Sequence, residues 1–124
     1  MNFVFCLGAV DFFTGICYSV LDGKEIQSRD FEVLVNTQPQ ICFVHWASPH
    51  VDGSMPKRAA KAGVNAKDSA PLYIAKARLS DWDQPKIGKI RDGDLTAVVA
   101  YNGESYTIPS GEFKVLCVEY SNDK

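Results

Sequence analysis

An internal repeat at an offset of 80 residues constrains this chain more than any other sequence feature. The repeated positions include a glycine, a two-residue turn ending in glycine, and a Phe-x-Val-Leu ending. A two-residue insertion in the second copy precedes that ending. Because a repeated pattern of this kind indicates a repeated structural unit, it must be explained before any fold is assigned. The matched positions are Gly8 with Gly88, 22–23 with 102–103, and 31–34 with 113–116.

Each copy contains the pattern of a β-hairpin. The runs 15–21 and 95–101 are rich in β-branched and aromatic residues, which favour strands. Asp-Gly at 22–23 and Asn-Gly at 102–103 favour type I′ turns, in which both central residues take positive φ. The sequence therefore predicts an all-β fold made of two antiparallel repeat units. We expect a pseudo-twofold axis to relate the units, which pack as one sandwich-like domain.

The repeat also sets the expected domain organisation. All of 1–124 is predicted to form one domain, with the back half of a repeat in 1–35 and a more complete repeat in 41–119. Strands are expected at 31–35 and 112–119 in equivalent places, and further strands at 41–46 and 71–79. In the last of these, Leu72, Ile74 and Ala77 are predicted to face the core. Tyr73, Lys76 and Arg78 are candidates for the opposite face if a bulge near Ala75 shifts the alternation. Residues 54–63 fit either a short helix or an extended loop.

Composition excludes several classes of protein. The hydrophobic fraction of 46% is enough for a core without metal or disulfide staples, and the net charge of −2 does not favour nucleic acid. The four cysteines lie in apolar runs, which predicts reduced, buried thiols and an intracellular, cytoplasmic protein, although secretion stays open. The apolar N-terminus lacks the basic region of a signal peptide, and no window is long enough to insert into a membrane.

The chemistry-bearing residues do not form a recognisable catalytic or metal site. Cys42 and His45 are separated by an odd number of residues, so a strand would point them to opposite faces, whereas zinc needs convergent ligands. No Gly-x-Ser-x-Gly motif and no phosphate-cradling loop is present, and no cysteine lies in a loop beside an expected histidine. We therefore expect neither an enzyme nor a cofactor or metal.

From residue 46 onward the order of motifs resembles the DM-nine repeat family. The matching positions are Trp46, Gly53, Met55-Pro56, Ala59, Gly63, Pro71-Leu72-Tyr73-Ile74, Lys76-Ala77, Gly88-Lys89-Ile90, Gly103-Glu104 and Phe113-Lys114-Val115-Leu116. Members of this family have tandem repeats in an all-β fold with pseudo-twofold symmetry, and some are mannose-binding lectins of innate recognition. The resemblance therefore implies a non-enzymatic carbohydrate-recognition domain that takes mannose or a mannose-containing glycan. Because single sugar sites bind weakly, useful avidity needs several sites, and a homodimer would supply two from one site per chain.

In the family's lectins, an acidic residue before Pro-Leu-Tyr and a lysine after Pro-Gly hold the sugar. The lysine corresponds to Lys89, and the acidic position falls on Asn65 or Asp68. Carboxylates accept hydrogen bonds from sugar hydroxyls and an aromatic face covers the ring, so nearby acidic and aromatic residues are added as candidate ligands. These are Trp82, Asp83 and Asp92, with Asp81 beside them.

The sequence also departs from the family pattern. Ala75-Lys76 replaces Gly-Arg, Ile87-Gly88 replaces Pro-Gly, and Ala9 stands where the first copy would carry the lysine. These departures favour an alternative function, in which the same fold serves as a protein-interaction or structural domain with a decayed sugar site.

Overall fold

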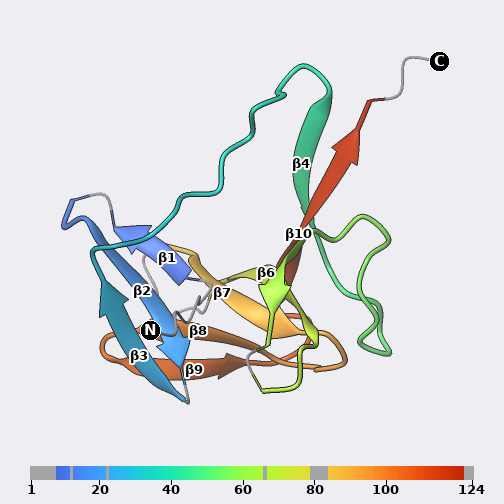
Figure 1. Ribbon diagram of the computed structural model, residues 1–124. Coiled ribbons are helices and arrows are strands. Elements are labelled where there is room, and N and C mark those ends of the chain that lie inside the picture. Colours follow the sequence, from blue (N-terminus) through green and yellow to red (C-terminus); the bar gives the residue numbers. More distant parts are fainter. Residues whose placement is uncertain (1–7, 12, 22, 66, 79–83, 122–124) are drawn as a thin grey trace.

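The protein folds as an all-β structure in the computed structural model, which describes residues 8–11, 13–21, 23–65, 67–78 and 84–121. The described residues form ten strands and contain no helix (Figure 1). The strands are β1 (Gly8–Asp11), β2 (Ile16–Leu21), β3 (Lys24–Ser28), β4 (Cys42–Ala47), β5 (Lys61–Val64), β6 (Pro71–Ala77), β7 (Lys86–Arg91), β8 (Ala97–Tyr101), β9 (Glu104–Ile108) and β10 (Phe113–Tyr120). The all-β class predicted from the sequence is confirmed.

All ten strands belong to a single open antiparallel sheet. The order along the sheet is β1-β2-β3-β9-β8-β7-β6-β10-β4, and β5 pairs with β6 beside this path. The sheet folds back on itself so that β1 and β2 lie against β7 and β8 (Figure 1). The described part of the chain has no helix long and apolar enough to cross a membrane.

The strand pairing itself repeats at the offset seen in the sequence. Gly8 pairs with Ser19 in the first copy, as Gly88 pairs with Val99 in the second. The hairpins also match, because Val20 pairs with Glu25 as Ala100 pairs with Ser105. The strand trio β1-β2-β3 therefore has the same register as β7-β8-β9, and the axis that would relate the two stays a prediction.

Close backbone approach explains why glycine recurs at position 8 of each copy. A Cβ at Gly8 would collide with the carbonyl oxygen of Tyr18, and a Cβ at Gly88 would collide with that of Val98. These two collisions involve residues that are again 80 positions apart. Glycine is thus required by the approach of neighbouring strands, and not by an unusual φ.

The second hairpin turn has the backbone conformation that the sequence predicts. Asn102 has φ 52° and Gly103 has φ 81°, so both central residues are in the left-handed region. In the first turn Gly23 has φ 77°, while Asp22 lies outside the described residues.

The strand predicted at 31–35 is wrong. These residues lie in an extended connection after β3, and the side chains of Val33, Leu34 and Val35 are 52%, 73% and 66% exposed. The matching segment of the second copy forms β10, which pairs with β6 on one side and β4 on the other. In the described sheet β1 is an edge strand, so the first copy offers no equivalent pair of neighbours.

The prediction for β6 is correct in part, because Leu72, Ile74 and Ala77 are buried as expected, but Tyr73 is buried as well. The pairing of β6 with β7 is continuous from Leu72 to Ala77, so no bulge shifts the alternation. Tyr73, Ala75 and Ala77 face the main core. The opposite face of β6 therefore carries Leu72, Ile74 and Lys76. The core cluster consists of Tyr73, Ala75, Ala77, Ile90, Ala97, Val99, Ile108, Phe113 and Val115.

Residues 54–63 form no helix, and of the two alternatives the extended loop is correct as far as residue 60, where β5 follows. A turn closes with the backbone N–H of Ala59 donating to the carbonyl of Pro56 at 3.0 Å, and Ala59 then bridges to Cys117 of β10. The segment continues directly into β5. Proline thus begins a turn here and not a helix.

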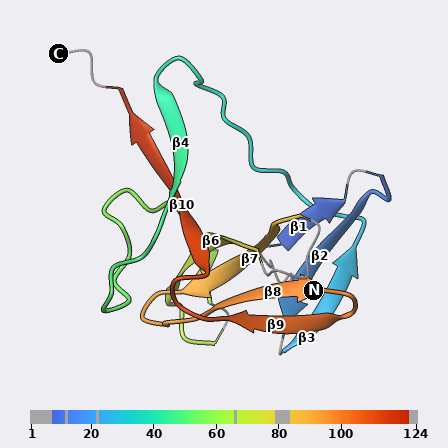
Figure 2. The ribbon, with the colours of Figure 1, turned by 180° about the vertical axis from the view of Figure 1, so that it is seen from behind.

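The strand β4 and the end of β10 form an arm that projects from the rest of the sheet (Figure 2). Phe43, Val44 and Tyr120 on this arm are 51%, 55% and 63% exposed. Large apolar side chains on an edge strand mark a surface that can pair with another chain.

Candidate functional site

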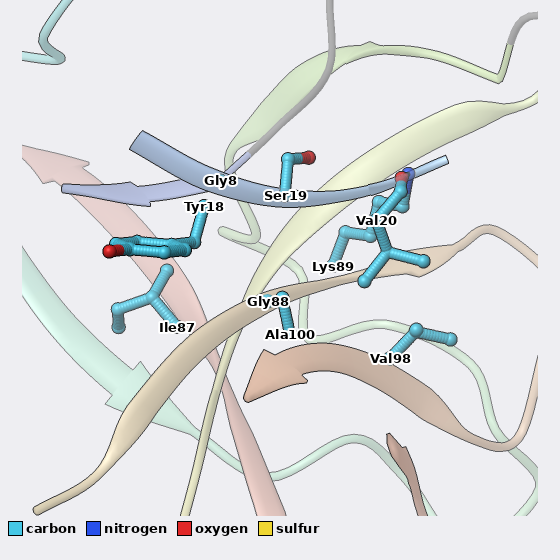
Figure 3. Close-up of a pocket in the computed structure, with 9 residues that line it drawn as sticks. All are labelled: Gly8, Tyr18, Ser19, Val20, Ile87, Gly88, Lys89, Val98 and Ala100. Carbon is cyan, nitrogen blue, oxygen red and sulfur yellow. Dashed lines mark hydrogen bonds between the residues drawn. The ribbon is translucent and has the colours of Figure 1, made fainter. Parts of the chain in front are cut away.

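Lys89 lies in the seam between the two copies. Its Nζ donates a hydrogen bond of 2.7 Å to the carbonyl oxygen of Val20 on β2, and the side chain is partly buried (Figure 3). The space enclosed by the seam is too small for a water molecule, but the Lys89 side chain is only partly buried, so part of it faces solvent. The seam is lined by Gly8, Tyr18, Ser19, Val20, Ile87, Gly88, Lys89, Val98 and Ala100 (Figure 3). Lys89 therefore links the copies, and its ammonium keeps two further N–H groups.

The first copy does not make the equivalent hydrogen bond to the second copy. The equivalent contact would join residue 9 to the carbonyl of Ala100, and residue 9 is alanine. The two copies therefore differ at this position, and only the second supplies an ammonium group to the seam.

Asn65 and Asp68 lie in a tight turn between β5 and β6. The backbone N–H of Asn65 donates to Ala70 O at 2.7 Å, and that of Ser69 donates to Asn65 O at 2.8 Å. The side-chain oxygen of Asn65 accepts from the backbone N–H of Lys67 at 2.9 Å. The side-chain oxygen of Asn65 thus stabilises the turn, and its NH₂ group can still donate a hydrogen bond to a ligand.

Arg91 holds this turn against the end of β7. Its Nε and Nη2 both lie 2.6 Å from Asp68 Oδ2, and its Nη1 lies 3.0 Å from Asp94 Oδ1. The hydrogen bond from Arg91 lowers the pKa of Asp68 below its usual 3.8. Asp68 is therefore an ionised partner of Arg91.

Three of the predicted ligands come together at the end of β7. The backbone N–H of Asp92 donates to Pro71 O at 2.8 Å, which places Asp92 beside the turn that contains Asn65 and Asp68. Lys89 lies on the same face of β7 as Arg91, but its described partner is the Val20 carbonyl and not one of these side chains. The remaining candidates, Trp82 and Asp83, lie outside the described residues, as does Asp81.

The described residues contain no group of three His, Cys, Asp or Glu side chains that could hold a metal. His45 Nδ1 lies 3.8 Å from Glu119 Oε2 across β4 and β10, and both side chains are about half exposed. Cys42 and Cys117 are free thiols, and burial raises the pKa of Cys117. A buried thiol of raised pKa is a poor nucleophile.

A second concave surface, which the sequence did not single out, lies between β6, β10 and β4. This groove has a volume of about 690 Å³ and is lined by Trp46, Ser48, Lys76, Ala77, Arg78, Pro85, Gly111, Glu112, Phe113 and Lys114. The sequence identified Trp46 as a family-pattern position and placed Lys76 on the face of its strand away from the core. It gave no sign that Lys114 would lie opposite Lys76, because that pairing depends on the register of β6 with β10.

Comparison with protein families gave a match over most of the chain. The model of the family described as DM9 repeat matches residues 5–108 of the chain. No curated protein and no solved structure showed significant similarity to it.

Proposed function

The chain belongs to the DM9 repeat family, and from this membership we propose that it is a non-enzymatic carbohydrate-recognition domain of the mannose-binding kind. The DM9 repeat has a mannose-binding-like fold, and the match covers the first copy and the second copy as far as the end of β9, at residue 108. The proposed site is the surface at the end of β7, where Asp92 and the turn 65–70 adjoin the strand that carries Lys89.

The observation that carries this proposal is the hydrogen bond from Lys89 to Val20. It fixes the position of the ammonium group at the family's lysine position and leaves two N–H groups to donate to a pair of sugar hydroxyls. The Asn65 NH₂ group and the Asp92 carboxylate supply further donors and acceptors. Because sugar hydroxyls exchange hydrogen bonds with water for hydrogen bonds with protein at small net gain, affinity should be near millimolar, or about −4 kcal/mol.

A titration of mannose followed by amide NMR shifts tests the proposal. We expect shifts at residues 65–70 and 89–92 in the wild type, and none in Lys89→Ala. Because Lys89→Ala also removes the hydrogen bond to Val20, thermal denaturation must show that the variant is folded. Asp92→Asn should weaken mannose binding independently of that hydrogen bond. Lys57→Ala, which alters an exposed lysine elsewhere, should bind like the wild type. Absence of wild-type binding at tens of millimolar mannose would reject the proposal.

A protein-interaction or structural domain of the same fold is the second candidate function. The observation in its favour is the apolar surface of the connection 31–35 and of β4, where large side chains are between 51% and 73% exposed, namely Val33, Leu34, Val35, Phe43 and Val44. If mannose binding fails and substitutions on this surface change the association state of the protein, this function takes first place.

A further inference from the structure

The groove between β6, β10 and β4 carries positive charge that the described protein does not neutralise. Lys76 of β6 lies directly opposite Lys114 of β10 in the antiparallel register. Like charges in directly opposite positions destabilise a sheet. Arg78 adds a third cation to the lining, against one carboxylate from Glu112. In the part of the chain that the structure describes, none of these four side chains has an ion pair.

An aromatic side chain adjoins the cations. The Nζ of Lys76 lies 4.5 Å from the ring centroid of Trp46, which is a cation–π contact. Trp46 is only partly buried, so part of its indole is available to a ligand in the groove. The hydroxyl of Ser48 lies on the same lining and can donate or accept a hydrogen bond.

We propose that this groove is a second ligand site, separate from the surface at the end of β7, and that it binds an anionic saccharide. The indole covers the C–H face of a sugar ring, and Lys76, Lys114 and Arg78 bind a sulfate or carboxylate group on that ring. The volume of about 690 Å³ lies within the range of small-molecule sites. The choice of a sugar rests on the proposed function, whereas the negative charge of the ligand rests on the groove alone.

The observations favour a small acidic sugar over nucleic acid. Nucleic-acid surfaces combine a basic track with several aromatic platforms, and this groove offers a single indole. The whole chain has a net charge of −2, which opposes long-range attraction to a polyanion. Bound anion would relieve the repulsion between Lys76 and Lys114, so the site is built for charge of opposite sign.

Tryptophan fluorescence provides a local readout of binding. The chain has two tryptophans, and Trp82→Phe leaves Trp46 as the only one. In this background we titrate a sulfated heparin disaccharide, its desulfated counterpart, inorganic sulfate, and a single-stranded oligonucleotide. We expect the sulfated disaccharide to change Trp46 emission and to lose affinity with rising salt. The desulfated sugar and sulfate alone should each bind at least tenfold more weakly.

Variants that remove single charges test whether the disaccharide binds in this groove. Lys114→Gln and Lys76→Gln should each weaken the sulfated disaccharide roughly tenfold, while Lys57→Gln should leave affinity unchanged. Lys114→Gln should not lower the melting temperature of the free protein, because it removes a like-charge contact. Equal affinity of Lys114→Gln and the parent, or binding of the oligonucleotide but not of the disaccharide, would overturn the proposal. If the protein binds mannose but not the sulfated disaccharide, only the proposal of this second site is rejected. If it binds the disaccharide but not mannose, the second site is supported and the mannose site is rejected.

Discussion

At the scale of single residues, the glycine at the start of each copy is the position where sequence and structure agree best. Gly88 has an ordinary φ, and it is required because Val98 O lies where a Cβ would stand. We expect Gly88→Ala to lower the free energy of unfolding by about 1–3 kcal/mol through overpacking. Urea denaturation measures this, with Thr107→Ala on the exposed side of β9 as control. A loss no larger than the control's would contradict the close approach.

The ion pair of Arg91 with Asp68 makes stability depend on pH. Because the folded pKa of Asp68 lies below its usual 3.8, the pair stabilises the protein above that value and the contribution is lost as pH falls through the folded pKa. The melting temperature of Asp68→Asn should therefore fall below the wild type's at neutral pH and converge with it in acid. Both side chains are about 40% exposed, so the difference should be small and should shrink with salt. A constant difference down to strongly acidic pH would contradict this assignment.

The sequence identified several important residues, but it did not predict which residues they would contact. Lys89 was singled out by the family pattern, but its hydrogen-bond partner Val20 is 69 residues away and belongs to the other copy. Only the folding of β2 over β7 brings the two together. The charge of the groove was hidden for a similar reason, since Lys76 and Lys114 become neighbours only through the register of β6 with β10.

At the scale of elements, local signals predicted the strands well. The Asn-Gly turn and its flanking β-branched runs became β8 and β9, and the runs at 41–46 and 71–79 became β4 and β6. The predicted strand at 31–35 did not form, although its sequence resembles that of β10. A strand needs neighbours on the sheet, and the sequence of one segment cannot report whether those neighbours exist.

A matched pair of substitutions separates sequence pattern from structural context. Leu34 and Leu116 occupy equivalent repeat positions, yet Leu34 is 73% exposed and Leu116 is 7% exposed. We expect Leu116→Ala to cost about 2–5 kcal/mol of unfolding free energy, and Leu34→Ala to stay within about 0.5 kcal/mol of the wild type. Chemical denaturation of the two variants measures both values. Comparable losses would show that 31–35 is packed in solution.

At the scale of the whole molecule, the two copies meet in two places. At one, Lys24 pairs with Glu104, and Ser105 Oγ donates to Gly23 O at 2.8 Å. At the other, the seam that contains Lys89 joins β2 to β7. The repeat in the sequence predicted two similar units, but not how they adjoin, because these contacts connect residues about 70 to 80 positions apart.

The arm formed by β4 and the end of β10 leads to the last prediction, which concerns association. In the described sheet β4 is a terminal strand, so no further strand pairs with its outer edge, and Phe43 and Val44 on it are 51% and 55% exposed. Only the start of this edge is covered, where the backbone N–H of Cys42 donates to Gln38 O and its carbonyl accepts from Asn36 Nδ2. Exposed apolar edges of this kind pair with another chain unless charge or proline protects them. We therefore expect a homodimer that joins two β4 edges in antiparallel pairing, the simplest arrangement with twofold symmetry.

Light scattering after size exclusion measures this directly. The wild type should have twice the mass of one chain, and Val44→Lys combined with Phe43→Lys should have the mass of a monomer, because lysines oppose each other across the paired edges. Leu34→Lys, which places the same charge on the other exposed apolar segment, should leave the dimer intact. A wild-type protein that is monomeric at all concentrations would contradict the edge pairing, and a dimer lost only in Leu34→Lys would move the interface to 31–35. A dimer through β4 would carry two copies of each ligand surface on one particle, so multivalent glycans should bind it more tightly than the monomeric variant.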